Sequence, residues 1–395
     1  MKYQYAKRME KVKPSAIREL LKLGADPEVI SFGGGYPDPT MFPIDKLQQV
    51  FDRVLLEEGQ QALQYTTSEG HLGLRLKLVK RMEKIGVRCD LENLFIINGG
   101  QQGLDLVAKM FIDRGDVILT EDPTFLGALV AFHPYEPTYA GVSMDKEGMN
   151  MDHLEQLLKA NPAAKIIYTV PDFQNPTGVT MSLERRKRLV ELANEFNVII
   201  IEDSPYREIR FEGEDLPSIK SFDTEGRVIH LGSFSKILCP GMRLGWLVAE
   251  RELAEKLCLL KMAADTQSST LNMHAVNRFM ELYNLDEHIN DLKKIYKHKK
   301  DIMFKMMKNT FPESIQYTNP EGGLFTWLTL PKNIDTASLM KDRLLPEAKV
   351  AYVPGSSFFP GKQEHNHCRL NYSYMPEEKI VVGMTRLGKL LTELC

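Results

Sequence analysis

The sequence has few cysteines, and no two of them have the spacing of a metal site. Its 395 residues include five cysteines, which are odd in number and widely scattered. Scattered, unpaired cysteines are typical of proteins in a reducing compartment, where thiols stay free. We therefore expect free thiols, a cytoplasmic location and no bound metal ion.

Long apolar runs and a strong charge imbalance are also lacking. No continuous apolar segment reaches membrane-spanning length, and residues 1–8 lack the apolar core of a signal peptide. The net charge is -3 at pH 7, which gives no reason to expect nucleic acid as a partner. With 43% apolar and 26% charged residues, the composition is that of a soluble globular protein.

Short apolar segments alternate with helical segments in the first two thirds of the chain. Because most of the seven segments are apolar along their length, they predict an α/β fold with a seven-stranded, mostly parallel sheet flanked by helices on both faces. Ligands of such sheets bind at the carboxyl ends of the strands. The predicted strands are residues 95–97, 117–119, 138–143, 165–170, 198–201, 228–231 and 243–248.

The rest of the chain predicts further parts. Residues 251–311 are strongly helical, and strands and helices mix again from residue 322, which indicates a smaller α/β domain. A helix start at Lys13 and a segment rich in glycine and proline precede the large domain. We predict an N-terminal helix with a glycine-rich loop at 1–43, a large domain at 44–285 and a small C-terminal domain at 286–395.

One lysine lies in a hydroxyl-rich loop. The strand at 228–231 leads into Gly-Ser-Phe-Ser-Lys, which ends at Lys236. The hydroxyls of Ser233 and Ser235, with the guanidinium of Arg243, make a suitable cradle for a phosphate. A lysine beside that cradle and away from bulk water loses its proton readily and becomes a nucleophilic amine. By itself the pattern fits an ordinary loop with a solvated lysine equally well.

Other polar residues follow the predicted strands. Asp203 follows the strand at 198–201, where a carboxylate can keep a pyridine nitrogen protonated, and Asn175 and Tyr206 offer an amide and a phenol as hydrogen-bond donors. Each piece alone is a common turn or cap. Together with Lys236 as an amine for an aldehyde, they match the chemistry of pyridoxal phosphate.

Two further requirements of that cofactor and its substrate are met. Gly100 and Gln101 lie at a predicted helix start, where backbone N–H groups and the helix dipole favour a phosphate. Arg369 is the candidate for a two-pronged bond to the carboxylate of an amino acid. We expect Lys236, Asp203 and Tyr206 to carry the chemistry.

At this point the chain resembles the class I, fold-type I pyridoxal-phosphate-dependent aminotransferases over nearly its whole length. Four motifs in the right order carry the resemblance: Asn-Pro-Thr-Gly at Asn175, Asp-x-x-Tyr at Asp203, Ser-Phe-Ser-Lys at Ser233 and Gly-x-Arg-x-Gly at Gly241. Within that family it is most similar to the 2-aminoadipate and kynurenine aminotransferase group. Supporting segments are Lys-Pro-Ser-Ala-Ile-Arg before residue 19, the stretch 30–43, and Gly-Gly-Gln-Gln-Gly at 99–103.

The resemblance implies further roles. It implies a homodimer with each active site at the subunit boundary, where Tyr65 reaches the phosphate bound by the neighbouring subunit. It also implies that Gly35 meets the substrate carboxylate. Arg18 would lie in a short helix that closes over the substrate and pair with a distal carboxylate; the alternative is a solvated arginine on a basic helix.

Two positions depart from the group's pattern. Phe125 occupies the place of a residue that is often tyrosine and stacks on the pyridine ring, so stacking is kept and the phenol is lost. Gly100 replaces a serine, so one phosphate hydroxyl is missing while the backbone donor remains.

The implied reaction is ping-pong transfer of the amino group of an L-amino acid (2-aminoadipate, aromatic, branched or other) to 2-oxoglutarate, with Lys236 as general base and then acid. One alternative is β-elimination with the same cofactor, since the cofactor residues are shared. Another is a non-catalytic effector-binding module, which in transcription regulators follows a DNA-binding domain; because the fold begins within about fifteen residues, we expect no such domain.

Overall fold

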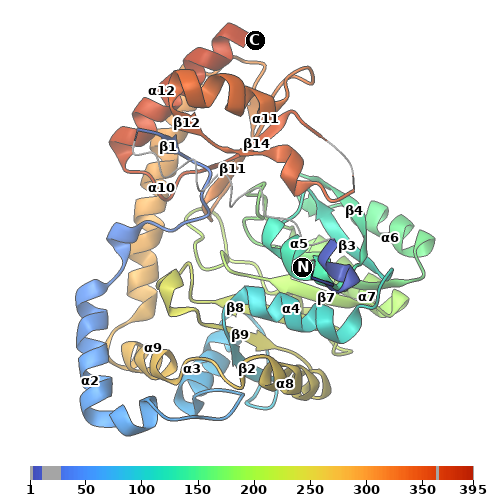
Figure 1. Ribbon diagram of the computed structural model, residues 1–395, viewed down its shortest axis with the longest axis vertical. Helices are drawn as coiled ribbons and strands as arrows, with labels where there is room; N and C mark the ends of the chain where they lie inside the picture. The colour runs from blue at the N-terminus through green and yellow to red at the C-terminus, as the bar shows by residue number, and fades with distance from the viewer. Residues whose placement is uncertain (1–2, 11–27, 362–363, 395) are drawn as a thin grey trace.

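The structure, a computed structural model, describes residues 3–10, 28–361 and 364–394. Figure 1 shows a lower region built around a large sheet and an upper region built around a small one. No helix among the described residues combines the length and apolarity that crossing a membrane would require. The expected helix start at Lys13 lies outside the described residues.

Within the described residues, the main sheet has eight strands in the order β2-β9-β8-β7-β6-β3-β4-β5. Strands β9 and β5 run antiparallel to their neighbours, and the other six share one direction. The strands are β2 (Leu94–Ile97), β3 (Val117–Asp122), β4 (Thr138–Asp145), β5 (Gly148–Met149), β6 (Ala164–Thr169), β7 (Ile199–Asp203), β8 (Val228–Ser233) and β9 (Gly245–Val248).

The α/β fold with a mostly parallel sheet is confirmed, and two details differ from the prediction. The eighth strand, β5, is a two-residue hairpin partner of β4, too short to show a periodic pattern. Strand β9 begins at Gly245 and not at residue 243, because Arg243 has a φ of 51°, in the left-handed region that strands do not use.

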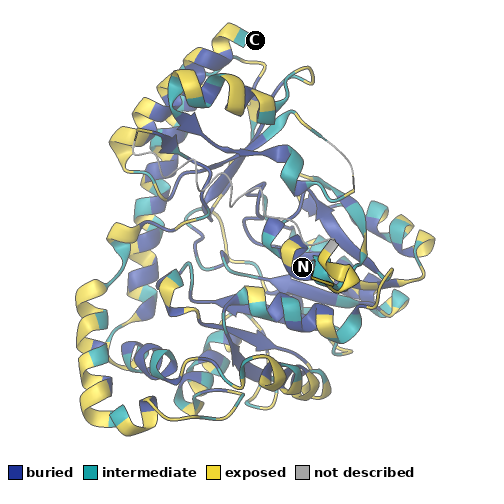
Figure 2. Cartoon of the chain, in the orientation of Figure 1, coloured by how far each residue is buried: buried dark blue, intermediate teal, exposed yellow. Residues whose placement is uncertain are grey.

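Helices cover both faces of the main sheet, and alternate residues of β2 pack into the cores on opposite faces. Phe95 and Ile97 belong to the core under α4 (Gly100–Phe111), whereas Leu94 and Ile96 belong to the core under α3 (Leu72–Glu83) and α9 (Thr270–Leu282). Successive strand residues point to opposite faces, so a continuously apolar strand is buried on both. Figure 2 shows this sheet buried, whereas α2 (Ile44–Ala62) is largely exposed.

The upper region contains a four-stranded antiparallel sheet in the order β10-β11-β14-β13 and a parallel pair, β1 with β12. These strands are β1 (Ile30–Ser31), β10 (Gln316–Tyr317), β11 (Phe325–Thr329), β12 (Val350–Ala351), β13 (Val353–Pro354) and β14 (His367–Asn371). Strands β12 and β13 are separated only by Tyr352, yet they belong to different sheets.

One long helix, α10 (Leu285–Thr310), packs against both regions (Figure 1). Its first half contributes Ile289 and Tyr296 to the core beneath the main sheet, and its second half contributes Met303 and Met307 to the core of the small sheet. The predicted boundary between residues 285 and 286 falls in its first turn. The division into three parts remains a prediction.

The remaining helices complete the two layers. Ser182 stands at the N-cap of α7 (Leu183–Phe196), but its side chain makes no capping hydrogen bond. Helix α11 (Thr336–Leu339) continues as a wider π-helical segment, Met340–Ala348, which contains Pro346. The other helices are α5 (Leu126–Phe132), α6 (Met151–Ala160), α7 (Leu183–Phe196), α8 (Arg251–Asp265), α11 (Thr336–Leu339) and α12 (Glu377–Leu394).

Candidate active site

A cavity of about 220 Å³ lies at the carboxyl ends of the parallel strands, next to the start of α4. Because β2, β3, β6, β7 and β8 run in one direction, the loops after them meet at the same edge of the sheet. The predicted site residues that line this cavity are Gly35, Gly100, Gln101, Phe125, Asn175, Asp203, Tyr206, Ser233, Ser235, Lys236, Arg243 and Arg369.

Lys236 extends into the cavity from the loop after β8. Its Nζ donates a hydrogen bond of 2.7 Å to the backbone oxygen of Gly35. Burial, together with the positive charges of Arg369 and Arg243, lowers the pKa of Lys236 to about 8. The amine is therefore partly neutral near physiological pH, the state required of a nucleophile or a general base.

Asp203 is the last residue of β7 and is buried beside the cavity. The Tyr168 hydroxyl donates a hydrogen bond of 2.9 Å to its Oδ2. Burial raises the pKa of Asp203 to about 6, while the Tyr168 hydrogen bond and the charge of His230 oppose that rise. Its Oδ1 faces Gly100, where a Cβ atom would lie 3.5 Å away, so the carboxylate is directed toward the start of α4.

Arg369 on β14 links the small sheet to the main one. Its Nη1 donates to Asn175 Oδ1 at 2.7 Å, and Asn175 Nδ2 donates to the Tyr206 hydroxyl at 3.0 Å. Its Nη2 donates to the backbone oxygen of Gly33 at 2.7 Å. The buried Nε has no hydrogen-bond partner among the described residues. Burial lowers the pKa of Arg369 to about 10, so it remains a cation.

The aromatic ring of Phe325 packs against the Arg369 guanidinium, whose central carbon lies 4.2 Å from the ring centre. Phe358 lies on it as well, with 5.2 Å between the same carbon and the ring centre. These rings hold the guanidinium plane and exclude water from it. An aligned guanidinium with an unused donor suits a planar carboxylate.

The other end of the cavity suits a phosphate. Helix α4 begins at Gly100, after Gly99 with a φ of 76°. Arg243 spans this start: its Nη2 donates to Asn98 O at 3.1 Å and its Nη1 to Ser235 Oγ at 3.4 Å. A Cβ atom on Gly99 would lie 2.7 Å from Arg243 Nη2, so the glycine makes this approach possible.

Phe125 lies at the N-terminal boundary of α5 and lines the cavity. A Cβ atom on Gly127 would lie 2.4 Å from its ring, so this glycine leaves room for the ring. The Gln101 side chain donates a hydrogen bond of 2.8 Å to Gly127 O. This bond holds the backbone next to Phe125 in position. A flat aromatic face at this place suits a stacked heteroaromatic ring.

The residues present fit pyridoxal phosphate. A desolvated amine, a buried carboxylate directed at the helix start, an aromatic face and a cationic cradle surround one cavity, as the donor set of that cofactor requires.

One predicted residue, Tyr65, does not line the cavity, and another, Arg18, is not described. Tyr65 is 80% exposed on the loop between α2 and α3. Arg18 lies outside the described residues.

Sequence reasoning missed the residues that surround Asp203. Tyr168 lies within β6, opposite Ile201 in β7, so the pairing of the strands places its hydroxyl near Asp203. His230 Nδ1 lies 3.1 Å from Glu202 Oε2, beneath the same strand ends. Both sit inside apolar strands, and a lone polar residue there carries no sequence signal of a partner.

The chain is similar to known proteins over nearly its whole length. The profile of the family described as aminotransferase class I and II matches residues 28–387. Aromatic-amino-acid aminotransferase 1 of Thermococcus litoralis is 44% identical over 387 residues, which cover 97% of this chain and 92% of the relative. The 2-aminoadipate transaminase of Thermus thermophilus is 38% identical over 393 residues, or 99% of this chain and 97% of the relative.

A solved structure is similar throughout. Kynurenine aminotransferase of Pyrococcus horikoshii, crystallised with PMP, has 39% sequence identity and a TM-score of 0.94, with 99% of this chain and 97% of that chain covered.

Proposed function

Because this chain belongs to the class I and II aminotransferases and is a pyridoxal-phosphate-dependent enzyme of that family, we propose that it transfers the amino group of an L-amino acid to 2-oxoglutarate in a ping-pong reaction. The convergence of Lys236, Asp203 and Arg369 on one cavity carries the proposal. The aromatic and 2-aminoadipate specificities of the relatives make aromatic amino acids and 2-aminoadipate the first donors to test.

We propose the following residues as those that hold the cofactor. Lys236 would bind its aldehyde, Asp203 its ring nitrogen, and Asn175 and Tyr206 its phenolate oxygen. When bound, the cofactor supplies an electron sink that stabilises the negative charge left by removal of the α-proton. The phosphate would be bound by Gly100, Gln101, Ser233, Ser235 and Arg243, with the ring stacked on Phe125.

Lys236 is proposed to move the proton. Its pKa of about 8 lets the amine accept a proton and return it near neutral pH. Its position at the backbone oxygen of Gly35 places Nζ beside the glycine-rich segment that we expect to contact the substrate. One amine can thus serve as base and then as acid.

Arg369 is proposed to orient the substrate. Two of its nitrogens are already held by Asn175 and Gly33, and its Nε retains an unused donor in a buried place. A carboxylate bound there satisfies the donor, and the rings around the guanidinium strengthen the contact by keeping water out.

We also propose a homodimer in which Tyr65 serves the neighbouring site. The support is an exposed apolar surface on and after α2, which a second copy would cover. Its members are Leu55, Leu56, Leu63, Tyr65 and Leu72. The free thiols of Cys89, Cys239, Cys258 and Cys368 support a cytoplasmic location.

The experiment is a panel of amino acids with purified protein, pyridoxal phosphate and 2-oxoglutarate, with glutamate formation as the readout. The proposal expects glutamate from at least one of 2-aminoadipate, kynurenine, phenylalanine and leucine. Each donor that yields glutamate should, without 2-oxoglutarate, convert the bound cofactor to its amine form. Pyruvate and ammonia from a cysteine-like substrate, with no glutamate from any donor, would establish the β-lyase alternative instead.

A further inference from the structure

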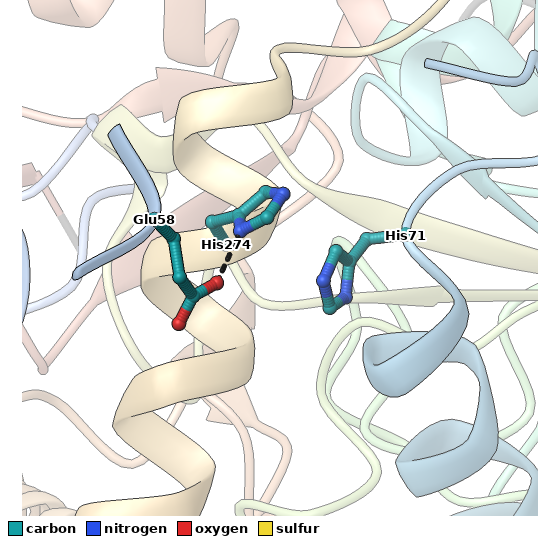
Figure 3. Close-up of side chains that lie close together, drawn as sticks. All are labelled: Glu58, His71 and His274. Atoms are coloured by element: carbon teal, nitrogen blue, oxygen red, sulfur yellow. Dashed lines mark hydrogen bonds and ion pairs between the residues drawn. The ribbon is translucent and has the colours of Figure 1, made fainter. Parts of the chain in front are cut away.

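Three potential metal ligands meet away from the active-site cavity. Glu58 comes from the end of α2, His71 stands just before α3, and His274 lies on α9 (Figure 3). One carboxylate oxygen and one nitrogen from each imidazole all lie within 4.8 Å of one another. None of these residues lines the proposed active site.

The contacts among them are polar and close. His274 Nδ1 lies 2.6 Å from Glu58 Oε2, and the rings of His71 and His274 meet edge to face with centroids 4.3 Å apart. Figure 3 shows both rings and the carboxylate directed toward one another. Arg278 pairs with the other oxygen of Glu58 and so holds the carboxylate in place.

We propose that Glu58, His71 and His274 form a binding site for a divalent transition-metal ion of the zinc class. Two imidazoles and one carboxylate are a ligand set that zinc accepts, with water as the fourth ligand. Ligand atoms about 2.0 to 2.2 Å from a tetrahedral ion are separated by roughly 3.3 Å. Side-chain rotations that bring the three atoms from within 4.8 Å to that spacing complete the site.

Binding competes with a second role of His71. Its Nδ1 accepts a hydrogen bond of 3.2 Å from the backbone N–H of Leu74 and thereby caps α3. A neutral imidazole has one bare nitrogen, so coordination through Nε2 moves the proton to Nδ1 and ends the capping bond. Asparagine at position 71 separates the two roles, because it caps a helix well but lacks the imidazole.

The ion would brace the loop between α2 and α3. This loop, residues 63–71, already bonds to the turn between α8 and α9: Ser68 Oγ donates to Thr266 O at 2.7 Å, and Thr66 N donates to Gln267 Oε1 at 2.5 Å. A metal held by Glu58 and His71 on either side of the loop and by His274 on α9 would tie the three elements together. Binding should therefore raise the thermal stability of the protein.

The test measures Co²⁺ and Zn²⁺ binding to the pyridoxal-phosphate-loaded enzyme after treatment with a chelator. Calorimetry gives the stoichiometry, and the visible absorption of Co²⁺ reports tetrahedral coordination. The variants are His71→Asn, which keeps the cap, and His274→Asn, whose amide can still donate to Glu58. The matched control is His298→Asn, because His298 is an exposed histidine on α10 that also pairs with a glutamate, Glu377, at 3.1 Å.

The proposal expects one ion per chain, a tetrahedral Co²⁺ spectrum and a higher melting temperature with Zn²⁺. Loss of an outer-shell partner weakens metal binding by about 10- to 100-fold, so loss of a ligand should weaken it by at least about 100-fold in both ligand variants. His298→Asn should bind like the unmodified enzyme.

Two results would overturn the site. One is the absence of stoichiometric binding, and the other is binding that persists equally in His71→Asn and His274→Asn. Unchanged circular dichroism and cofactor content of the variants establish that they fold, so that a loss of binding is assigned to the ligands. If the cluster serves only as a polar contact, His71→Asn and the unmodified enzyme have the same melting temperature, both with and without Zn²⁺.

Discussion

Lys236 Nζ lies 2.7 Å from the backbone oxygen of Gly35, although the two residues are 201 positions apart. This contact brings the glycine-rich segment of the N-terminal part onto the reactive amine. It connects the loop after β8 with the segment that follows β1, the strand that pairs with β12 in the upper region. The amine therefore lies between the two regions of the molecule.

Lys236→Ala should remove covalent retention of the cofactor after borohydride reduction and nearly all turnover. Among the described residues that line the cavity, Lys236 is the one lysine, so no other amine there can replace it. Peptide mapping after reduction identifies the modified residue. Lys146→Ala, at an exposed turn between β4 and β5, is the control and should keep both properties. A reduced adduct on another lysine would refute the assignment.

The lowered pKa of Lys236 predicts how the stability of the cofactor-free protein depends on pH. In the folded state the pKa is about 8, below the ordinary value of about 10.4, so burial of the cation destabilises the protein below pH 8. Between about pH 8 and 10.4 the unfolded state binds more protons, and this cost disappears as pH rises.

Lys236→Met should therefore raise the free energy of unfolding at pH 7 by up to about 3 kcal/mol, from 1.36 kcal/mol per pKa unit. Its advantage should fade toward pH 10. Urea unfolding of the unmodified protein and of Lys236→Met, each at pH 7 and pH 10, measures the difference in their free energies of unfolding. The contributions of the other titrating groups cancel in that difference. A constant advantage at both pH values would mean that packing, and not charge, is responsible.

Tyr168→Phe should slow turnover although Tyr168 is absent from the sequence motifs. The variant removes the hydrogen bond to Asp203 Oδ2, and hydrogen bonds to charged groups contribute about 1.5 to 3 kcal/mol, or about 10- to 100-fold in rate. The pKa of Asp203 should also rise, because that bond lowers it. The acid side of the pH profile of kcat should therefore move to higher pH.

The control for this variant is Tyr139→Phe on β4. The Tyr139 hydroxyl is buried and has no hydrogen-bond partner among the described residues. Its loss therefore removes a hydroxyl from the same sheet but no hydrogen bond to Asp203. Equal effects of the two substitutions on kcat would show that the Tyr168 bond is only structural.

Arg369→Lys should raise KM for every amino acid by about 10- to 100-fold, because the charge is kept while the two-pronged donor is lost. Steady-state kinetics with one aromatic and one dicarboxylic donor measure this. Arg210→Lys is the matched control: Arg210 is also buried and stacked on a ring, at 4.7 Å from Phe173, but pairs with Glu321 away from the cavity. An effect on one donor class alone would assign Arg369 to side-chain recognition.

Arg18→Ala tests the prediction that Arg18 pairs with a distal carboxylate of the substrate. A charge pair with a distal carboxylate contributes about 1 to 3 kcal/mol, so kcat/KM for 2-aminoadipate or glutamate should fall by about five- to a hundred-fold. Aromatic donors should be little affected. Arg8→Ala, an exposed arginine nearby in the sequence, is the control. Equal losses for both donor classes would make Arg18 a structural residue.

Much of the fold and many lining residues could be predicted because their signals are local. Seven apolar segments predicted seven strands of the main sheet, since a strand buried on both faces must be apolar throughout. The loop of Lys236 was predictable for a similar reason. Ser233, Ser235 and Arg243 are close in sequence, and all three side chains suit the binding of a phosphate. The position of Asp203 follows from the strand before it.

Contacts between distant segments could not be predicted. The bond from Arg369 to Asn175 spans 194 positions, and the cluster of Glu58, His71 and His274 spans 216. A single sequence shows which residue types are present, but the distance between two such residues depends on how sheets and helices pack.

The sequence by itself therefore determined the fold class, the family and the residue types of the cofactor pocket, because backbone periodicity and motif chemistry act over a few residues. Only the tertiary structure decided which oxygen Lys236 contacts, which hydroxyl supports Asp203 and which donors of Arg369 remain unused. The reason is physical: burial and electrostatic fields shift the pKa values of Lys236 to about 8 and of Asp203 to about 6, and both arise only when the chain has packed.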